Sequence, residues 1–128
     1  MKNAIIAVFA LALLAAGGCA SAETHAQKRR AELLATYPVG TTTRADVLRA
    51  WHYAEPELIE RRPKAGWDKS HNSMVAQRCI ASERRTGKRV DRVDRYSAPD
   101  GMFSICYQWF YYDAAEHLVD VDWERGTE

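Results

Sequence analysis

Three carboxylates alternate along the last predicted strand of the chain, at Asp120, Asp122 and Glu124. Side chains two residues apart on a strand point to the same side, so these three share one face of a sheet. Such a row has the oxygen donors for a bound cation, or for a general acid and a general base. The same alternation of polar and apolar residues is typical of a strand with one wet face. We expect these three carboxylates to be solvated and to have no catalytic or metal-binding role.

A second candidate is Ser70 beside His71 and Asp68, which together have the residue types of a hydrolase triad. Triad members meet in space rather than in sequence, and the sequence has no G-x-S-x-G turn that would present a nucleophile. The chain has four His and three Cys, but no C-x₂-C or H-x₃-H spacing of the kind that binds zinc. A phosphate loop and a dinucleotide fingerprint are also missing from the sequence. We therefore expect no catalytic residues, no metal site, no cofactor and no small-molecule substrate.

The start of the chain has the pattern of an export signal. One basic residue, Lys2, precedes an unbroken apolar run from Ala4 to Ala16. A basic start, an apolar stretch of about 7–15 residues and small residues at its end describe a secretory signal. A helix of this length covers about 20 Å, which is short of the roughly 30 Å hydrocarbon core of a bilayer. An N-terminal core helix would need a polar face, which this run lacks.

The segment from Leu14 to Cys19 resembles the lipobox of bacterial lipoproteins, in which a Cys after small residues is lipidated and becomes the mature N-terminus. We expect residues 1–18 to be a signal peptide, Cys19 to carry palmitate and other acyl chains, and residues 19–27 to tether the domain. The rival cleavage site is an A-x-A pattern ending at Ala22, which would release a soluble protein. The residue after the Cys is Ala rather than Asp. By resemblance to enteric lipoproteins, this favours the periplasmic face of the cell outer membrane.

The length and charge of the chain limit the classes of protein that it can belong to. With 128 residues, 47% of them hydrophobic, the chain is long enough for one domain with a core. A formal net charge of +1 excludes the large basic surplus that is typical of a nucleic-acid binder. The basic residues between Arg84 and Arg95 have the charge to meet lipid phosphates. Acidic residues interrupt them, however, and favour a charge-balanced surface.

Lipidation of Cys19 would leave two other cysteines, Cys79 and Cys106, in an oxidising compartment. The even number predicts a disulfide bond between them. Such a bond would contribute about 3–4 kcal/mol to stability in the chain-entropy model.

Helices are predicted in the first two thirds of the chain. Apolar periodicity predicts one helix over residues 28–37 and a second over 44–52, with Thr43 and Asp46 as a capping pair. Residues 57–61 are expected to form a further turn between two prolines. A third helix is favoured over 70–85 with Gly87 as its C-cap, and a short strand over 74–80 is the alternative.

The last third of the chain has the pattern of a β-sheet. Strands are predicted over residues 89–96, 102–112 and 118–124, with short turns between them. Consecutive strands joined in this way form a three-stranded antiparallel meander. Helices followed by a meander predict a single α+β domain over residues 28–128, with the N-terminal helices packed on one face of the sheet.

The strand over 102–112 carries aromatic residues on both of its faces, and only the more apolar face is expected to lie under the helices. The other face carries Gln108, Phe110 and Tyr112. One interpretation is that residues 64–89 cover this face and bring Cys79 to Cys106. The other is that Gln108, Phe110 and Tyr112 form an exposed patch that docks a partner protein.

Two stretches of the sequence resemble a known family. Residues Val39 to Leu48 look like the opening of the SmpA/OmlA, or BamE-like, lipoprotein domain. Residues Trp109 to Asp113, followed by Leu118 to Val121, are similar to its closing hairpin. The resemblance implies a part in outer-membrane protein assembly. We therefore expect a non-enzymatic envelope lipoprotein that binds or scaffolds another envelope protein. The alternative is a periplasmic binding or inhibitory module similar in shape to β-lactamase-inhibitor proteins.

Overall fold

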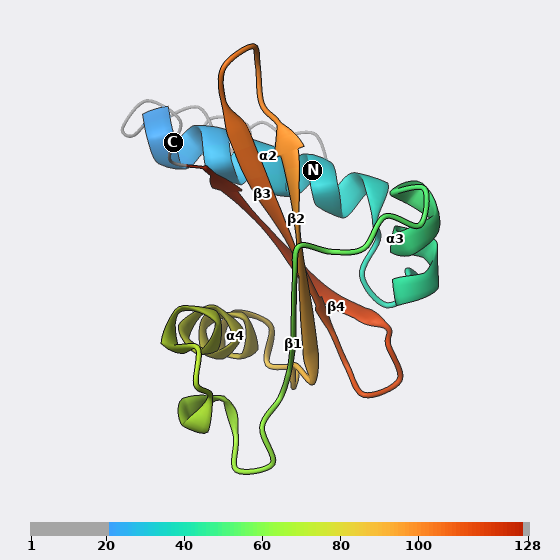
Figure 1. Ribbon diagram of the computed structural model, residues 1–128, viewed down its shortest axis with the longest axis vertical. Helices are drawn as coiled ribbons and strands as arrows, with labels where there is room; N and C mark the ends of the chain where they lie inside the picture. The colour runs from blue at the N-terminus through green and yellow to red at the C-terminus, as the bar shows by residue number, and fades with distance from the viewer. Residues whose placement is uncertain (1–20, 127–128) are drawn as a thin grey trace, which may run out of the picture.

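The aromatic strand β3 (Ile105–Tyr112) lies inside a four-stranded antiparallel sheet (Figure 1). Its neighbours are β2 (Arg92–Pro99) and β4 (Leu118–Arg125), and β1 (Leu58–Arg61) pairs with the other side of β2. The strand order therefore follows the chain, as expected when each strand pairs with the next.

This computed structural model describes residues 21–126. The predicted signal peptide, residues 1–18, and the predicted lipidation site Cys19 lie outside the described residues.

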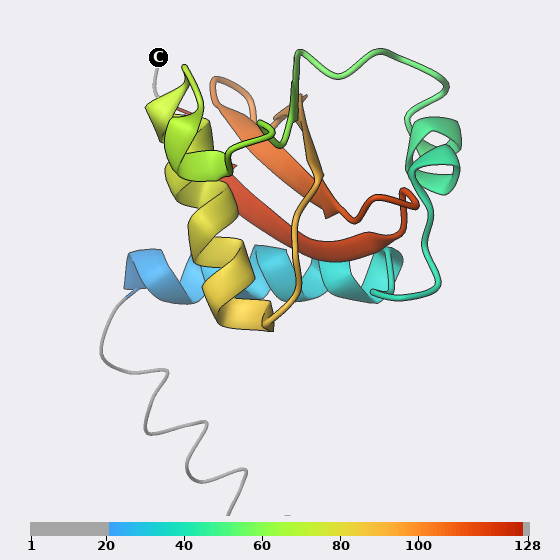
Figure 2. The same ribbon diagram turned by 90° about the horizontal axis from the view of Figure 1, so that it is seen from below.

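Among residues 21–126, three α-helices and one short 3₁₀ helix pack around the sheet (Figures 1 and 2). They are α2 (Ser21–Thr36), α3 (Arg44–Ala50), the 3₁₀ helix η1 (Trp67–Lys69) and α4 (Ser73–Thr86). Helices α2 and α3 cover one face of the sheet, and α4 with η1 covers the other. No α-helix in this part of the chain is long and apolar enough to cross a membrane.

The ends of α3 and α4 follow from local sequence. Thr43 accepts a hydrogen bond from the backbone N–H of Asp46, and the Asp46 carboxylate accepts one from the backbone N–H of Thr43. This reciprocal pair satisfies two N–H groups that a helix start otherwise leaves free. The Asn72 side chain caps α4 by accepting one hydrogen bond, from the backbone N–H of Val75, and Gly87 ends the helix with φ +69°, a left-handed conformation that glycine adopts at little cost.

The sheet separates two clusters of buried side chains. The α4 side contains Trp109 and Tyr111 of β3, packed with Val75 and Cys79 of α4. The α2 side contains Phe110 and Tyr112 of β3, packed with the residues Val47, Tyr96, Leu118 and Val121. Partly buried residues of α2, and one residue directly after each of α2 and α3, pack against this cluster. Because neighbouring residues of a strand point to opposite faces, one aromatic strand supplies both cores.

The structure confirms the α+β class and corrects its details. Residues 58–61 form a fourth strand where the sequence predicted a turn, because they pair with β2 over residues 92–95. The helices lie on both faces rather than on one. The predicted tether is helical from Ser21 onward, since no Pro or Gly interrupts residues 21–37.

Candidate functional site

Phe110 and Tyr112, predicted to dock a partner, are core residues. Both side chains are 0% exposed. The Phe110 ring meets Tyr37 edge to face at 5.2 Å between centroids, where the end of α2 covers this face of the sheet. Gln108 is half-buried and lines a groove between α2 and the β2–β3 hairpin. The prediction of a docking patch here is wrong, because α2 and α3 occupy the face that it needs.

The predicted disulfide between Cys79 and Cys106 is also wrong. Both thiols are free and buried. Cys79 lies in the core on the α4 side, whereas Cys106 lines the groove beside α2 on the other face of the sheet. Residues 64–89 do form a cover, but over the opposite face from Cys106. Burial raises the pKa of each thiol, so both are held as the protonated and less reactive form.

Asp120 departs most from the prediction of a solvated carboxylate row. Its side chain is 1% exposed and lies between two helices. The Ser82 hydroxyl of α4 donates to one carboxylate oxygen at 2.7 Å, and the Arg30 guanidinium of α2 donates to the other at 2.8 Å. Arg85 of α4 donates to the same oxygen as Ser82. Burial acts to lower the pKa of Arg85, but the hydrogen bond and charge of Asp120 outweigh it and leave that pKa raised.

Asp122 and Glu124 likewise form ion pairs with a residue of α4. They share the face of Asp120, since all three pair in register with residues of β3 that face α4. Arg78 donates to Asp122 at 3.3 Å and forms an ion pair with Glu124. The same guanidinium lies over the Trp109 ring, 4.7 Å from its centroid. Among residues 21–126, no three His, Cys, Asp or Glu side chains are placed to hold a metal ion.

A second buried carboxylate, Asp94, holds α3 to the sheet. Asp94 is 0% exposed and accepts hydrogen bonds from Arg44 of α3 at 2.7 Å and from Arg92 at 3.2 Å. Arginine fits such sites because its planar guanidinium stays charged and offers several donors. Asp94 and Asp120 thus each join a helix to the sheet, and their oxygens are occupied by these donors.

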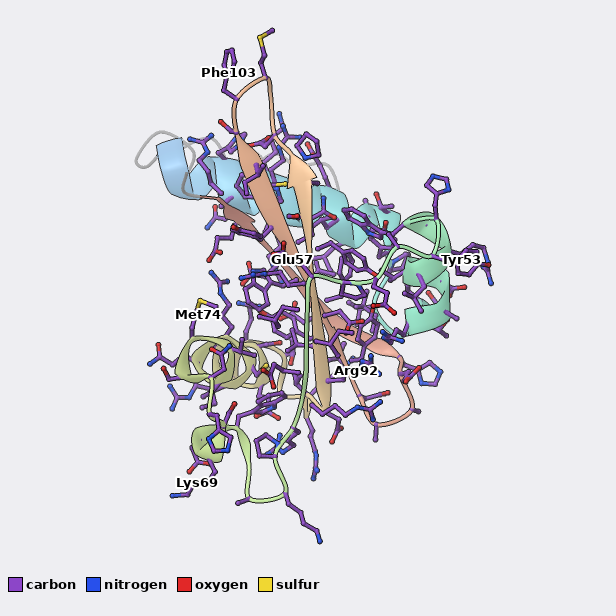
Figure 3. The ribbon with its side chains drawn as sticks, viewed as in Figure 1. Tyr53, Glu57, Lys69, Met74, Arg92 and Phe103 are labelled. Atoms are coloured by element: carbon purple, nitrogen blue, oxygen red, sulfur yellow. The ribbon has the colours of Figure 1, made fainter. Side chains whose placement is uncertain are left out.

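One cleft of about 410 Å³ is lined mainly by charged residues. It brings together three segments that are far apart in sequence, residues 61–64, 89–92 and 113–116. We name it the Arg-rich cleft, because Arg61, Arg62, Lys64, Arg89 and Arg92 line it together with three acidic residues. Arg61 and Lys64 form no ion pair with any described residue, whereas Arg62, Arg89 and Arg92 are paired. Arg92 lies in the lower half of the molecule in Figure 3.

The hairpin between β2 and β3 carries the most exposed large apolar side chains in the described part of the chain. Met102 is 87% exposed and Phe103 is 80% exposed. We name residues 101–105 the hairpin tip. Figure 1 shows it extending beyond α2, and in Figure 3 Phe103 points away from the molecule.

A groove of about 360 Å³ lies at the base of this hairpin, against α2. Arg29 and Glu32 of α2 form one wall, and Asp100 and Gln108 lie opposite. Arg29 and Asp100 approach each other to 3.9 Å. The Arg29 guanidinium is therefore shared between two carboxylates of the groove, Glu32 at 3.0 Å and Asp100 at 3.9 Å.

The predicted triad does not form. Asp68 lies in η1 and His71 after it, both exposed, and the Ser70 hydroxyl accepts a hydrogen bond from the backbone N–H of Asn72. No hydrogen bond joins Ser70, His71 and Asp68 in the described structure.

Known proteins give no further guide to the site. No protein family, curated protein or solved structure matches this chain. The resemblance to the SmpA/OmlA domain stays a prediction, and so does everything that it implies.

The sequence contained signals for two features that its interpretation missed. Two large apolar residues, Met102 and Phe103, directly follow the turn residues Asp100 and Gly101, which is where a hairpin tip is exposed. Arg78 and Arg85 are seven residues apart and therefore lie on one face of α4, and neither has an acidic residue three or four positions away in the sequence. The convergence of residues 61–64 and 89–92 depends on the pairing of β1 with β2, and no local pattern shows it.

Proposed function

We propose that this chain is a lipid-anchored protein of the cell envelope that binds another envelope protein and carries out no reaction. The position of Cys19 carries the proposal. It closes the apolar run of the signal and lies two residues before α2 begins. Helix α2 packs on the sheet through Leu33 and Leu34, and Tyr37 directly after it does the same, so acyl chains on Cys19 would hold the folded domain close to the membrane. More than one acyl chain gives stable anchoring.

The Arg-rich cleft is the surface that we assign to the partner protein. Arg61 and Lys64 are exposed and free of ion pairs among the described residues, so their charges are available to a partner. Five basic and three acidic side chains give the cleft an excess of positive charge. The chemistry that fits it is an acidic segment of another protein, since opposite charges steer association and fix its register.

We keep a part in outer-membrane protein assembly in the proposal. Its support is the resemblance of residues 39–48, 109–113 and 118–121 to the SmpA/OmlA domain. An inhibitory module would suit an open aromatic sheet face. Helices α2 and α3 cover that face, so we do not propose inhibition.

Site-specific crosslinking in living cells tests the partner. A photoreactive residue at Ala114, which is exposed and lines the cleft, is compared with one at Met74, which is 46% exposed on α4. We expect Ala114 to give one adduct whose crosslinked peptide is rich in Asp and Glu. The charge reversals Arg61→Glu and Lys64→Glu together should lower its yield about tenfold, the effect of roughly 1.4 kcal/mol.

Two results would contradict this assignment of the cleft. One is an adduct of equal yield from Met74, which would mean that contact is not specific to the cleft. The other is an adduct from Ala114 that the double charge reversal leaves unchanged, which would mean that the free positive charges do not contribute.

A further inference from the structure

The hairpin tip has a shape and composition that the core does not explain. Its two largest side chains, Met102 and Phe103, are 87% and 80% exposed, and Ile105 is 39% exposed beside them. The other exposed large apolar residues, among them Tyr53, Ile59 and Met74, lie singly on separate elements. Single exposed apolar residues are ordinary, whereas adjacent ones at a projecting turn mark a contact site.

The turn itself presents these side chains outward. Gly101 has φ +86°, a conformation that other residues rarely adopt, and it comes directly before Met102. The backbone N–H of Asp100 donates to the carbonyl of Ser104 at 2.8 Å and closes the turn. Residues 101–105 include no charged side chain. The tip is therefore a closed, neutral and apolar projection.

The position of the tip relative to the start of α2 indicates what the tip contacts. In Figure 1 the hairpin tip and the beginning of α2 lie toward the same end of the long axis of the molecule. Arg29 of α2 and Asp100 of the hairpin approach to 3.9 Å, which fixes the two elements to each other. Cys19 is two residues before α2, so an anchor there would bring the same end of the domain to the lipid surface.

We propose that the hairpin tip inserts Met102 and Phe103 into the outer part of the bilayer in which Cys19 is anchored. The inference rests on the lipid anchor of the proposed function. Apolar side chains enter the boundary between headgroups and acyl chains because burial there removes them from water. An uncharged tip requires no anionic lipid. Two points of attachment would fix the orientation of the domain. Arg92, which lines the Arg-rich cleft, lies in the half of the molecule away from Phe103 (Figure 3), so the cleft would then lie away from the membrane.

Depth-dependent fluorescence quenching tests this in the mature, lipidated protein. An NBD fluorophore is attached at Met102→Cys, and in a matched control at Met74→Cys on α4. Both positions are exposed, while the two native thiols, at 0% and 4% exposure, are shielded from the label. The protein is reconstituted into vesicles of phosphatidylethanolamine and phosphatidylglycerol that contain lipids with spin labels on their acyl chains. Flotation of the vesicles reports the anchor separately.

We expect the protein to float with the vesicles, and the label at 102 to be quenched at least threefold more than the label at 74, with a blue-shifted emission. Replacing Phe103 by Ser in the labelled protein should reduce that quenching, while circular dichroism stays unchanged because residue 103 is outside the core. Flotation with equal quenching at both positions would overturn the inference and leave the anchor in place.

Two further outcomes also decide the question. A protein that does not float would contradict the proposed anchor, and the inference with it. A blue shift at position 102 that occurs in native envelope membranes but not in pure lipid vesicles would mean that the tip docks on a protein, which also overturns the inference.

Discussion

Replacing Asp120 by Asn removes a buried charge and leaves the shape of the side chain almost unchanged. In the folded protein this carboxylate accepts hydrogen bonds from Ser82, Arg30 and Arg85, and it joins α2 and α4 to the edge strand β4. An Asn carbonyl can still accept from Ser82. Its NH₂ group, however, would face a guanidinium that has no acceptor.

The loss of stability in Asp120→Asn can be estimated from how exposed the two arginine partners are. Hydrogen bonds to charged groups contribute about 1.5–3 kcal/mol each, and breaking a fully buried ion pair costs about 3–5 kcal/mol. The Arg30 and Arg85 side chains are 30% and 39% exposed, so both can turn to water and recover part of the loss. We therefore expect Asp120→Asn to lower the free energy of unfolding by about 2–3 kcal/mol, which lowers Tm by about 8–20 °C in a domain of this size.

Urea unfolding followed by circular dichroism measures this loss, with Asp122→Asn as the matched control. Asp122 is 26% exposed, and its partner Arg78 also pairs with Glu124. The control should therefore cost at most about 0.5–1 kcal/mol, as surface ion pairs do. A loss below about 0.5 kcal/mol for Asp120→Asn would refute the reasoning, because it would restore the interpretation of Asp120 as a solvated carboxylate.

Three further outcomes follow from buried and capping groups. Tyr112→Phe should leave the free energy of unfolding unchanged or raise it by up to about 1 kcal/mol in urea titrations, because the buried hydroxyl has no hydrogen-bond partner among the described residues. Tyr112→Ser should lower the free energy of unfolding by about 3–5 kcal/mol, because it removes a buried ring. A Ser variant as stable as the wild type would contradict a core role for this residue. Hydrogen bonds from Thr43 lower the pKa of Asp46 from its ordinary value of 3.8. The carboxylate therefore contributes to stability above that pH, and this contribution is lost as the pH falls through the lowered pKa. Thr43→Ala should raise the pKa of Asp46 in an NMR titration, and an unchanged pKa would count against the capping pair. The thiols of Cys79 and Cys106 should react with a thiol reagent only after denaturation, and fast labelling of the native protein would argue against their burial.

The parts of the fold that the sequence predicted well are those with local signals. The capping pair of Thr43 and Asp46 is present, and Gly87 ends α4 as predicted. Both are determined by residues within one turn of the helix end, so no distant contact is needed to foresee them. Strand β4 was also predicted nearly to its ends, because apolar and acidic residues alternate over the six residues from Val119 to Glu124.

The fourth strand had no such signal. Residues 58–61 are too few to show alternation, and they become a strand because β2 offers its free edge. The Arg-rich cleft depends on that pairing, which brings Arg61 and Lys64 beside the segment from Arg89 to Arg92. A cleft built from paired strands is therefore not visible in any window of the sequence.

The aromatic residues of β3 show how one pattern can have two physical meanings. Large apolar side chains on both faces of a strand indicate either an exposed patch or a sheet that is covered on both sides. The structure has the second arrangement, with Phe110 on the α2 side and Trp109 on the α4 side. The same arrangement separates Cys79 from Cys106. It also buries Asp120, because α4 lies over the face that alternation alone had indicated to be wet.

The mature N-terminus of the protein, purified from the membranes of cells that export it, tests the central claim most directly. Intact mass and peptide mass spectrometry should find a chain that begins at Cys19 and carries covalently bound acyl chains, and Cys19→Ser should abolish incorporation of labelled palmitate. An unmodified chain that begins at Glu23, recovered from the soluble periplasmic fraction, would contradict the lipid anchor and show that cleavage follows the A-x-A pattern ending at Ala22.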